Sequence, residues 1–400
     1  MNGNFNMVKK NKQEDEEEET VVESSSSDSQ EVKSKMIKLM LFIVGGFVIL
    51  LLILFVISSL KPKSYTHREI ENVLKTAAIE YFKDYPESLP AVNGNIVEID
   101  SSYLFNAGKM KELGEYLPEG EACTGKVQVQ NVEGSYLYTP YLNCGDAYTT
   151  MELYKKITDP SKVVSSGYGL YSHNGTYTYR GEVQDNYVQL DKALWRIVKV
   201  TSNNNIVLIN ENGTNYTEVW DNRYNKTQLY DAGINDYSVS RIKEYLEKIY
   251  KGVDEKLKDE EKILSKRDRS YLVPYNLCVG KRSANSTSNN NTEECTKTIK
   301  NQMIGLLTLS DFLYVSLDKD CTTATSKTCK NYNYLTQKKD WWLITGDKDN
   351  DAKVFKVNRS GFAELNDASM TAEVRAVVYL NSRVLYRSGN GTKEKPYRIR

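Results

Sequence analysis

Histidine is scarce in this sequence, which has only two among its 400 residues, His67 and His173. Nucleophilic catalysis by serine or cysteine usually depends on a neighbouring histidine base. His67 follows closely on a long apolar run, and His173 stands in a Ser-His-Asn-Gly stretch that is typical of an exposed loop. Carboxylates are abundant, but no pair of them can be placed across a cleft from the sequence. We therefore expect a protein that is not an enzyme.

An excess of charge of either sign is also absent, because 53 Lys and Arg residues balance 53 Asp and Glu residues. Proteins that bind nucleic acid usually carry a basic field, so we expect no nucleic-acid partner, and we expect no cofactor. Tyrosine is common, with 29 residues against nine phenylalanines. A tyrosine ring packs while its hydroxyl stays hydrated, which indicates half-exposed sheet surfaces. A tyrosine-lined ligand groove is the alternative.

The cysteines form no CxxC motif and no cluster with histidine, so we expect no metal site built on sulfur. All six follow the long apolar run. An even number confined to one side of a membrane predicts three disulfides in an oxidising compartment. We expect neighbours in the sequence to pair, although other pairings stay open: Cys123 with Cys144, Cys278 with Cys295, and Cys321 with Cys329.

The sequence has one long apolar run, residues 39–60, which contains no charged residue. As an α-helix it would span roughly 30 Å, the thickness of the hydrocarbon core of a bilayer. We expect a transmembrane helix over residues 36–60 that contacts membrane lipid and stays as a single-pass anchor. A cleaved signal peptide is the alternative, but the run exceeds a typical signal segment. Residues 1–35 contain an acidic block and a serine run, which predict a disordered arm.

The orientation of this anchor depends on the cysteines, because basic residues stand on both sides of the apolar run and nearly balance. Disulfides form outside the cytoplasm. We therefore expect a cytoplasmic N-terminus and an extracellular body at the cell membrane.

Residues 61–155 are expected to form a small α+β module. Thr66 and Glu69 have the spacing of a capping box before an amphipathic helix, and a second short helix is expected over residues 102–117. Residues 126–130 and 135–142 predict a hairpin. This hairpin would place Cys123 opposite Cys144 at bridging distance.

Two stretches of this module carry a resemblance: CTGKVQV at residues 123–129 and YLYTPYLNCGDAYTT at residues 136–150. With the preceding helix, they resemble the small pilin-like module of surface proteins from low-GC Gram-positive bacteria. The resemblance covers residues 65–150. The prepilin cleavage motif is absent at the head of the apolar run, so we expect a permanent anchor.

Residues 165–400 are expected to form a larger, strand-rich α+β domain. Residues 193–200 and 206–210 predict a hairpin, and residues 238–250 predict an amphipathic helix. The charged segment 254–269 predicts a solvated helix or loop. Further elements are expected as a short helix at 307–317 and strands at 341–345, 353–358, 362–365 and 374–380.

This domain also carries a resemblance, on LWRI at residues 194–197, LLTLSD at 306–311, WWLIT at 341–345 and SGNGTKEKPYRI at 388–399. These motifs resemble bacterial surface domains of unassigned function that are similar to the C-type-lectin-like fold of formylglycine-generating enzymes. That activity relies on cysteines near the C-terminus. The cysteines here have structural spacings, so we do not expect the activity.

Trp341 and Trp342 are the candidate ligand-binding residues, together with the loop of residues 346–351. Adjacent residues of a strand face opposite sides, so one ring is expected in the core and the other exposed, where it can stack on a sugar or a peptide. The alternative is that flanking loops cover both rings.

Asp347, Asp349 and Asp351 have the first three ligand spacings of a calcium loop. Ala352 and Asn358 stand where such a loop needs glycine and glutamate, so an acidic hairpin turn is the simpler interpretation and calcium is a weak alternative. The sequence as a whole predicts a non-catalytic cell-surface binding or adhesion protein that recognises a glycan or an envelope polymer. The alternative is a pseudopilin-like component of a secretion or envelope assembly, acting through protein contacts.

Overall fold

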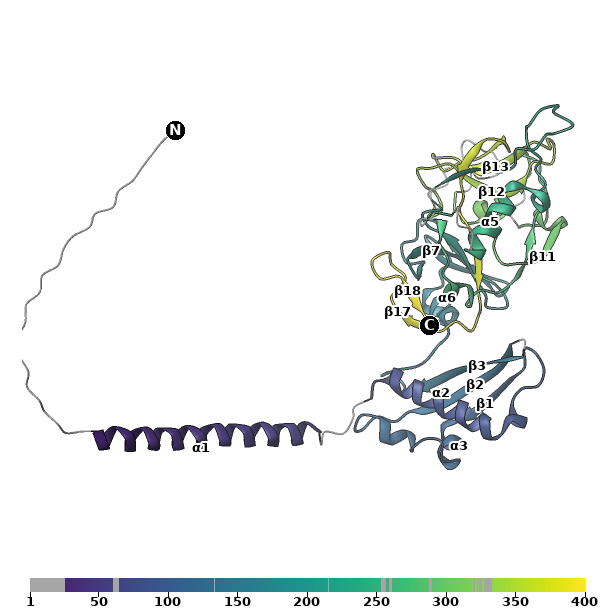
Figure 1. Ribbon diagram of the computed structural model, residues 1–400. Coiled ribbons are helices and arrows are strands. Elements are labelled where there is room, and N and C mark those ends of the chain that lie inside the picture. The colour runs from purple at the N-terminus through teal and green to yellow at the C-terminus, as the bar shows by residue number, and fades with distance from the viewer. Residues whose placement is uncertain are drawn as a thin grey trace, which may run out of the picture. The chain divides into compact units, whose positions relative to one another are not determined.

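The computed structural model describes residues 26–400 except 60–64, 133, 215, 253–256, 259, 260, 288, 289, 319, 320, 322, 324, 325 and 327–332. The fold is mixed α+β (Figure 1). The chain divides into two compact units, residues 1–66 and 67–400, and each is described by itself.

In its described part, the first unit contains one helix, α1 (Ser26–Ser59). Its segment Glu31–Phe55 includes a stretch with a mean hydropathy of 2.9 and no buried residue, so it is long and apolar enough to cross a membrane. Membrane anchors and signal sequences share this property. The helix also includes residues 26–35, which were expected in the disordered arm, and Glu31 pairs with Lys35 one turn later at 3.0 Å. The rest of that arm lies outside the described residues.

The second unit begins with α2 (His67–Asp84), which packs on a three-stranded antiparallel sheet (Figure 1). The strands are β1 (Ile96–Asp100), β2 (Thr124–Val132) and β3 (Ser135–Asn143), and α3 (Ser101–Asn106) follows β1. Helix α2 lies close to β2 at Gly125, where an added Cβ atom would stand 3.0 Å from the Leu74 side chain. The predicted amphipathic helix and the hairpin are confirmed. The second helix, expected over residues 102–117, is shorter: α3 ends at Asn106, and a single 3-10 turn follows at Leu113–Tyr116.

Disulfides close two of the hairpin-like segments. Cys123 and Cys144 flank the last pair of the β2–β3 ladder, with Cα atoms 4.2 Å apart. A second disulfide joins Cys278 to Cys295, whose Cα atoms are 4.5 Å apart. Both pairs are those expected from the sequence. Cys321 is also disulfide-bonded, whereas its expected partner, Cys329, lies outside the described residues.

The largest sheet has eight strands in the order β16-β8-β7-β6-β18-β17, with β5 on β7 and β4 on β5. Antiparallel pairing dominates, but β18 runs parallel to β6 and pairs Tyr397 with Val188. The β7–β8 hairpin is the one predicted, with the same bounds. The strands are β4 (Gly169–His173), β5 (Thr176–Arg180), β6 (Tyr187–Leu190), β7 (Ala193–Val200), β8 (Ile206–Asn210), β16 (Val377–Leu380), β17 (Tyr386–Ser388) and β18 (Tyr397–Ile399).

A five-stranded sheet, in the order β14-β13-β12-β15-β9, shares one apolar core with the large sheet. Its strands are β9 (Thr217–Val219), β12 (Trp341–Gly346), β13 (Lys353–Val357), β14 (Ala363–Asp367) and β15 (Thr371–Glu373). The remaining elements are α4 (Leu153–Ile157), α5 (Arg241–Lys251), α6 (Lys266–Arg269), α7 (Leu309–Tyr314) and the paired strands β10 (Tyr275–Cys278) and β11 (Thr298–Gln302).

Two further expectations differ from this fold. The strand expected at 374–380 is shorter and begins at Val377, because residues 374–376 connect β15 in one sheet with β16 in the other. Arg375 lies between them, fully buried, and donates to the carbonyls of Asn210 and Leu335. The charged segment 254–269 is not simply solvated, since it contributes Leu257, Ile263 and Leu264 to the core.

Candidate functional site

The two candidate tryptophans are both fully buried, so the expectation of one exposed ring is wrong. Every residue of β12 is buried, because β12 lies between β13 and β15 and is covered on both faces. Trp341 packs edge-to-face on Phe312 and beneath the guanidinium of Arg375. The indole of Trp342 donates to the carbonyl of Glu218 at 2.8 Å. Neither ring presents a face on which a ligand can stack.

The three aspartates after β12 occupy the turn between β12 and β13, and each has its own partner. The Asp347 carboxylate accepts from the backbone amide of Asp349, whose carboxylate accepts from Ser283 at 2.6 Å. Asp351 accepts from Asn225 at 3.2 Å. In the part of the chain that the structure describes, these carboxylates do not gather into a potential metal-binding group. The geometry is that of a hydrogen-bonded acidic turn.

His173 ends β4 and is exposed at a tight hairpin whose next residues, Asn174 and Gly175, both have positive φ. The side-chain amide nitrogen of Asn174 lies 3.1 Å from its Nε2. His173 is therefore an exposed residue at a hairpin end.

A cavity of about 500 Å³ is lined by α2 and β3 and by three parts of the larger sheet region, residues 270–271, residues 381–387 and Arg400. It combines basic and apolar side chains, a lining that suits an anionic ligand with apolar faces. The lining includes Arg68, Glu71 and Lys75 from α2, Leu137 and Tyr138 from β3, and Tyr271, Arg383, Val384, Arg387 and Arg400.

Glu71 anchors this cavity. Its side chain is 1 % exposed and accepts from Arg400 Nη2 at 2.6 Å and from the Tyr148 hydroxyl at 3.0 Å, and Thr150 donates to it as well. A buried carboxylate requires such partners, because burial removes its hydration. Burial and the neighbouring Glu71 carboxylate raise the pKa of Tyr148, which keeps its hydroxyl a donor. The only acidic side chain of the cavity is therefore neutralised within the protein.

The other basic side chains of the cavity are not neutralised. Arg68 donates to the carbonyl of Arg387 at 3.1 Å, a neutral acceptor. No carboxylate of the described residues forms an ion pair with Lys75, Arg383 or Arg387. Clustered cations without counter-charges raise the local positive potential. The cavity therefore favours an anion.

The apolar side of the cavity comes mainly from β3 and the segment after β16. Leu137 is 47 % exposed, whereas Val384 is 4 % exposed and forms part of the floor. Tyr138 and Tyr271 add aromatic rings. Aromatic rings pack on the apolar faces of sugars while their hydroxyls remain hydrated.

A second hollow, of about 190 Å³, adjoins the first and shares Tyr271 and Arg387 with it. It adds Arg267 and Arg398 together with Asp191 and Asp268. Asp268 is already engaged, because it closes the capping box of α6 with Ser265. The two hollows thus make one extended surface.

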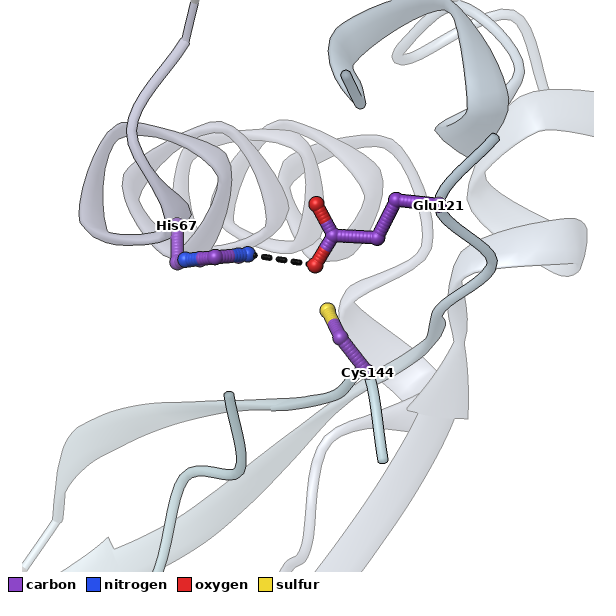
Figure 2. A group of neighbouring side chains, drawn as sticks. All are labelled: His67, Glu121 and Cys144. Atoms are coloured by element: carbon purple, nitrogen blue, oxygen red, sulfur yellow. Dashed lines mark hydrogen bonds and ion pairs between the residues drawn. The ribbon is translucent and has the colours of Figure 1, made fainter. Parts of the chain in front are cut away.

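A polar cluster lies at the beginning of α2 (Figure 2). His67 Nε2 is 2.7 Å from Glu121 Oε1, and the Cys144 sulfur lies near both. The His67 ring stacks on Tyr148, with ring centroids 4.6 Å apart. Tyr148 in turn donates to Glu71, so this cluster adjoins the partners of Glu71.

The sequence interpretation did not identify the cavity. One signal was present, because residues 383–400 contain six basic residues and a single acidic one. The other half of the lining comes from α2, more than 300 residues earlier, and no local pattern indicates that these segments meet.

Comparisons with protein-family models, with curated proteins and with solved structures find no match for this chain. The site is therefore interpreted from its own geometry and chemistry.

Proposed function

We propose that the protein is a non-catalytic cell-surface binding protein whose cavity beside α2 recognises an anionic polymer of the cell envelope. The observation that carries this proposal concerns three cations around the cavity, Lys75, Arg383 and Arg387. They form no ion pair with a carboxylate of the described residues, and Glu71, the one acid that the described lining contains, is paired internally. Guanidinium groups match carboxylate and phosphate geometry.

The apolar part of the lining indicates a polymer rather than a small ion. A repeating unit with an apolar face can pack on Leu137 and Tyr138 while its anionic group meets the arginines. The adjoining hollow, with Arg267 and Arg398, can take a neighbouring unit of the same polymer. Several weak contacts along one chain together give higher avidity.

The proposed location is the outer face of the cell membrane. Helix α1 would be a retained single-pass anchor, with the N-terminus in the cytoplasm. Disulfide bonds in the second unit support an oxidising exterior. Residues 61–155 would be the pilin-like module and residues 165–400 the C-type-lectin-like domain. The packing of α2 on β1–β3 supports the first assignment, and the mixed sheet with parallel β6 and β18 is compatible with the second.

The test uses the full chain in detergent micelles and two soluble probes, polygalacturonate as the polyanion and dextran as the neutral polymer. We expect the protein to bind polygalacturonate but not dextran. The affinity for polygalacturonate should fall as the salt concentration rises, because salt screens exposed charges. Replacing Arg383 and Arg387 by alanine should lower affinity about 10-fold or more. Arg359→Ala is the matched control, since Arg359 is 78 % exposed and does not line the cavity. Equal binding by R383A/R387A and wild-type protein would reject the proposal.

A second candidate function is the pseudopilin-like one, in which the protein contacts other proteins of an envelope assembly. Exposed apolar side chains on residues 67–150 favour it, because such groups are typical of protein interfaces. They include Tyr103, Phe105, Tyr136 and Leu137. Cross-linking in intact membranes should then capture envelope proteins from wild-type cells and fewer from Tyr103→Ser/Phe105→Ser cells, with polygalacturonate binding unchanged.

A further inference from the structure

The polar cluster at the beginning of α2 brings together the atoms that usually bind zinc. His67 Nε2, Glu121 Oε1 and Cys144 Sγ all lie within 4.8 Å of one another (Figure 2). A fourth donor is adjacent, because the Cys144 sulfur is bonded to that of Cys123. Two cysteines, one histidine and one carboxylate are a donor set that zinc accepts in tetrahedral sites.

The disulfide determines whether this donor set can act. Zinc binds thiolates, and a sulfur within a disulfide has no thiolate charge to offer. With the disulfide closed, only His67 and Glu121 remain as ligands. Two ligands are fewer than the three or four that protein zinc sites use.

We propose that Cys123, Cys144, His67 and Glu121 form a zinc site that exists only when the Cys123–Cys144 disulfide is reduced. A dithiol supplies the two electrons: one of its sulfurs attacks Cys123 Sγ, the bond to Cys144 breaks, and the second sulfur then displaces Cys123. The protein gains two thiols and the reductant becomes a disulfide. Zinc then replaces the two thiol protons, which pass to water.

The local structure allows this exchange. Two thiolates bound to one zinc ion stand about 3.7 Å apart, given Zn–S bonds of about 2.3 Å in a tetrahedron. Cys123 and Glu121 lie in a segment without helix or strand that precedes β2, so Cys123 can move until the two sulfurs reach this separation. His67 and Cys144 have more fixed positions, at the first residue of α2 and directly after β3. Cys123 is also the more exposed of the two sulfur residues, which favours attack there.

Such a site would replace one cross-link by another. The disulfide joins the segment before β2 to the end of β3, and zinc would keep both attached to α2 through His67 after reduction. His67 also stacks on Tyr148, a partner of Glu71. Zinc would therefore preserve the arrangement around α2 in a reducing environment.

The experiment uses the full chain in detergent micelles, reduced with a water-soluble phosphine and titrated with zinc against a chromogenic chelator. We expect the reduced chain to bind one more zinc ion than the Cys123→Ser/Cys144→Ser variant. His67→Ala and Glu121→Gln should each weaken this binding about 10-fold or more. The matched control is Cys278→Ser/Cys295→Ser, which should retain this zinc ion. The oxidised chain should not bind it.

Cobalt provides a second readout, since a thiolate–cobalt site absorbs in the near ultraviolet, and this absorption should be lost in Cys123→Ser/Cys144→Ser. His67→Ala and Glu121→Gln keep both cysteines, so their oxidised forms can be checked for folding by circular dichroism before reduction. Zinc affinity that is the same in the reduced wild-type chain and in these two variants would overturn the proposal. Equal affinity of oxidised and reduced chains would overturn it as well. Neither result depends on polymer binding at the cavity.

Discussion

Glu71 and Arg400 form an ion pair, with Arg400 Nη2 2.6 Å from Glu71 Oε1, although 329 positions separate them in the sequence. Glu71 is almost completely buried, whereas the Arg400 side chain is 21 % exposed. Because Arg400 directly follows β18 and Glu71 lies in α2, the ion pair connects the large sheet to α2. It also removes the only acidic charge from the cavity lining.

We predict that Arg400→Ala lowers the free energy of unfolding by about 3 kcal/mol, because it leaves a buried carboxylate without its cation. Glu71→Gln should cost less, since the amide still accepts from Tyr148 and Thr150. Urea denaturation of the second unit, followed by circular dichroism, measures both. Arg359→Ala is the control for a lost surface arginine. A loss below about 0.5 kcal/mol in Arg400→Ala would show that the pair is not stabilising.

Trp342→Ala should destabilise the fold by about 3–5 kcal/mol, because the ring is fully buried and its removal leaves a cavity. Binding of polygalacturonate should not change at temperatures where the variant is folded, since Trp342 does not line the cavity beside α2. Thermal unfolding and a binding titration on the same sample separate the two effects. Weaker binding of polygalacturonate by the folded variant would contradict this prediction and indicate that Trp342 contributes to binding.

Stability in acid should depend on Asp340. Burial alone would raise its pKa, but hydrogen bonds from Lys356 at 2.7 Å and from the Arg359 amide at 2.9 Å outweigh burial, so the pKa lies below its ordinary value of 3.8. A carboxyl group with a lowered folded-state pKa adds stability above pH 3.8, and this contribution is lost as the pH falls through the folded-state pKa.

We therefore expect wild-type protein to lose unfolding free energy below about pH 4 more steeply than Asp340→Asn does. Urea denaturation at several pH values between about 2 and 6 gives the two slopes. Parallel slopes would indicate that Asp340 titrates alike in the folded and unfolded chains.

The proposed topology predicts that a membrane-impermeant protease, added to intact cells, removes the second unit. An antibody against residues 67–400 should lose its signal, while an epitope tag at the N-terminus should be protected in the cytoplasm. Lysed cells serve as the control in which both are digested. Protection of residues 67–400 in intact cells would invert the orientation of α1.

Local patterns predicted a substantial part of this fold. The β7–β8 hairpin has the predicted bounds because alternating and apolar residues flank a short polar turn. The two described disulfides join cysteines that are neighbours in the sequence, and for Cys123–Cys144 the spacing around a hairpin turn also predicts the pair. Short strands such as β17 and β18 were missed, since three residues carry too little pattern and their pairing depends on distant partners.

The candidate site was less accessible to sequence reasoning. One of the two rings, Trp341 or Trp342, was expected at a surface because alternation assumes one solvated face, whereas β12 is covered on both sides. The cavity depends on Arg68 and Arg383 lying close together, and that proximity follows from tertiary packing alone. Whether a basic side chain lacks a carboxylate partner can be judged only from the three-dimensional structure, because ion pairs can join residues that are distant in the sequence.

The parallel pairing of β18 with β6 has a kinetic consequence. Val188 and Tyr397 are roughly two hundred residues apart in the sequence, so closing this contact restricts a very long loop. Hairpins such as β7–β8 can form early, whereas the β6 edge must wait for β18. Folding should therefore have a slow final phase in which β18 docks, and an unpaired β6 edge would invite pairing between chains until then.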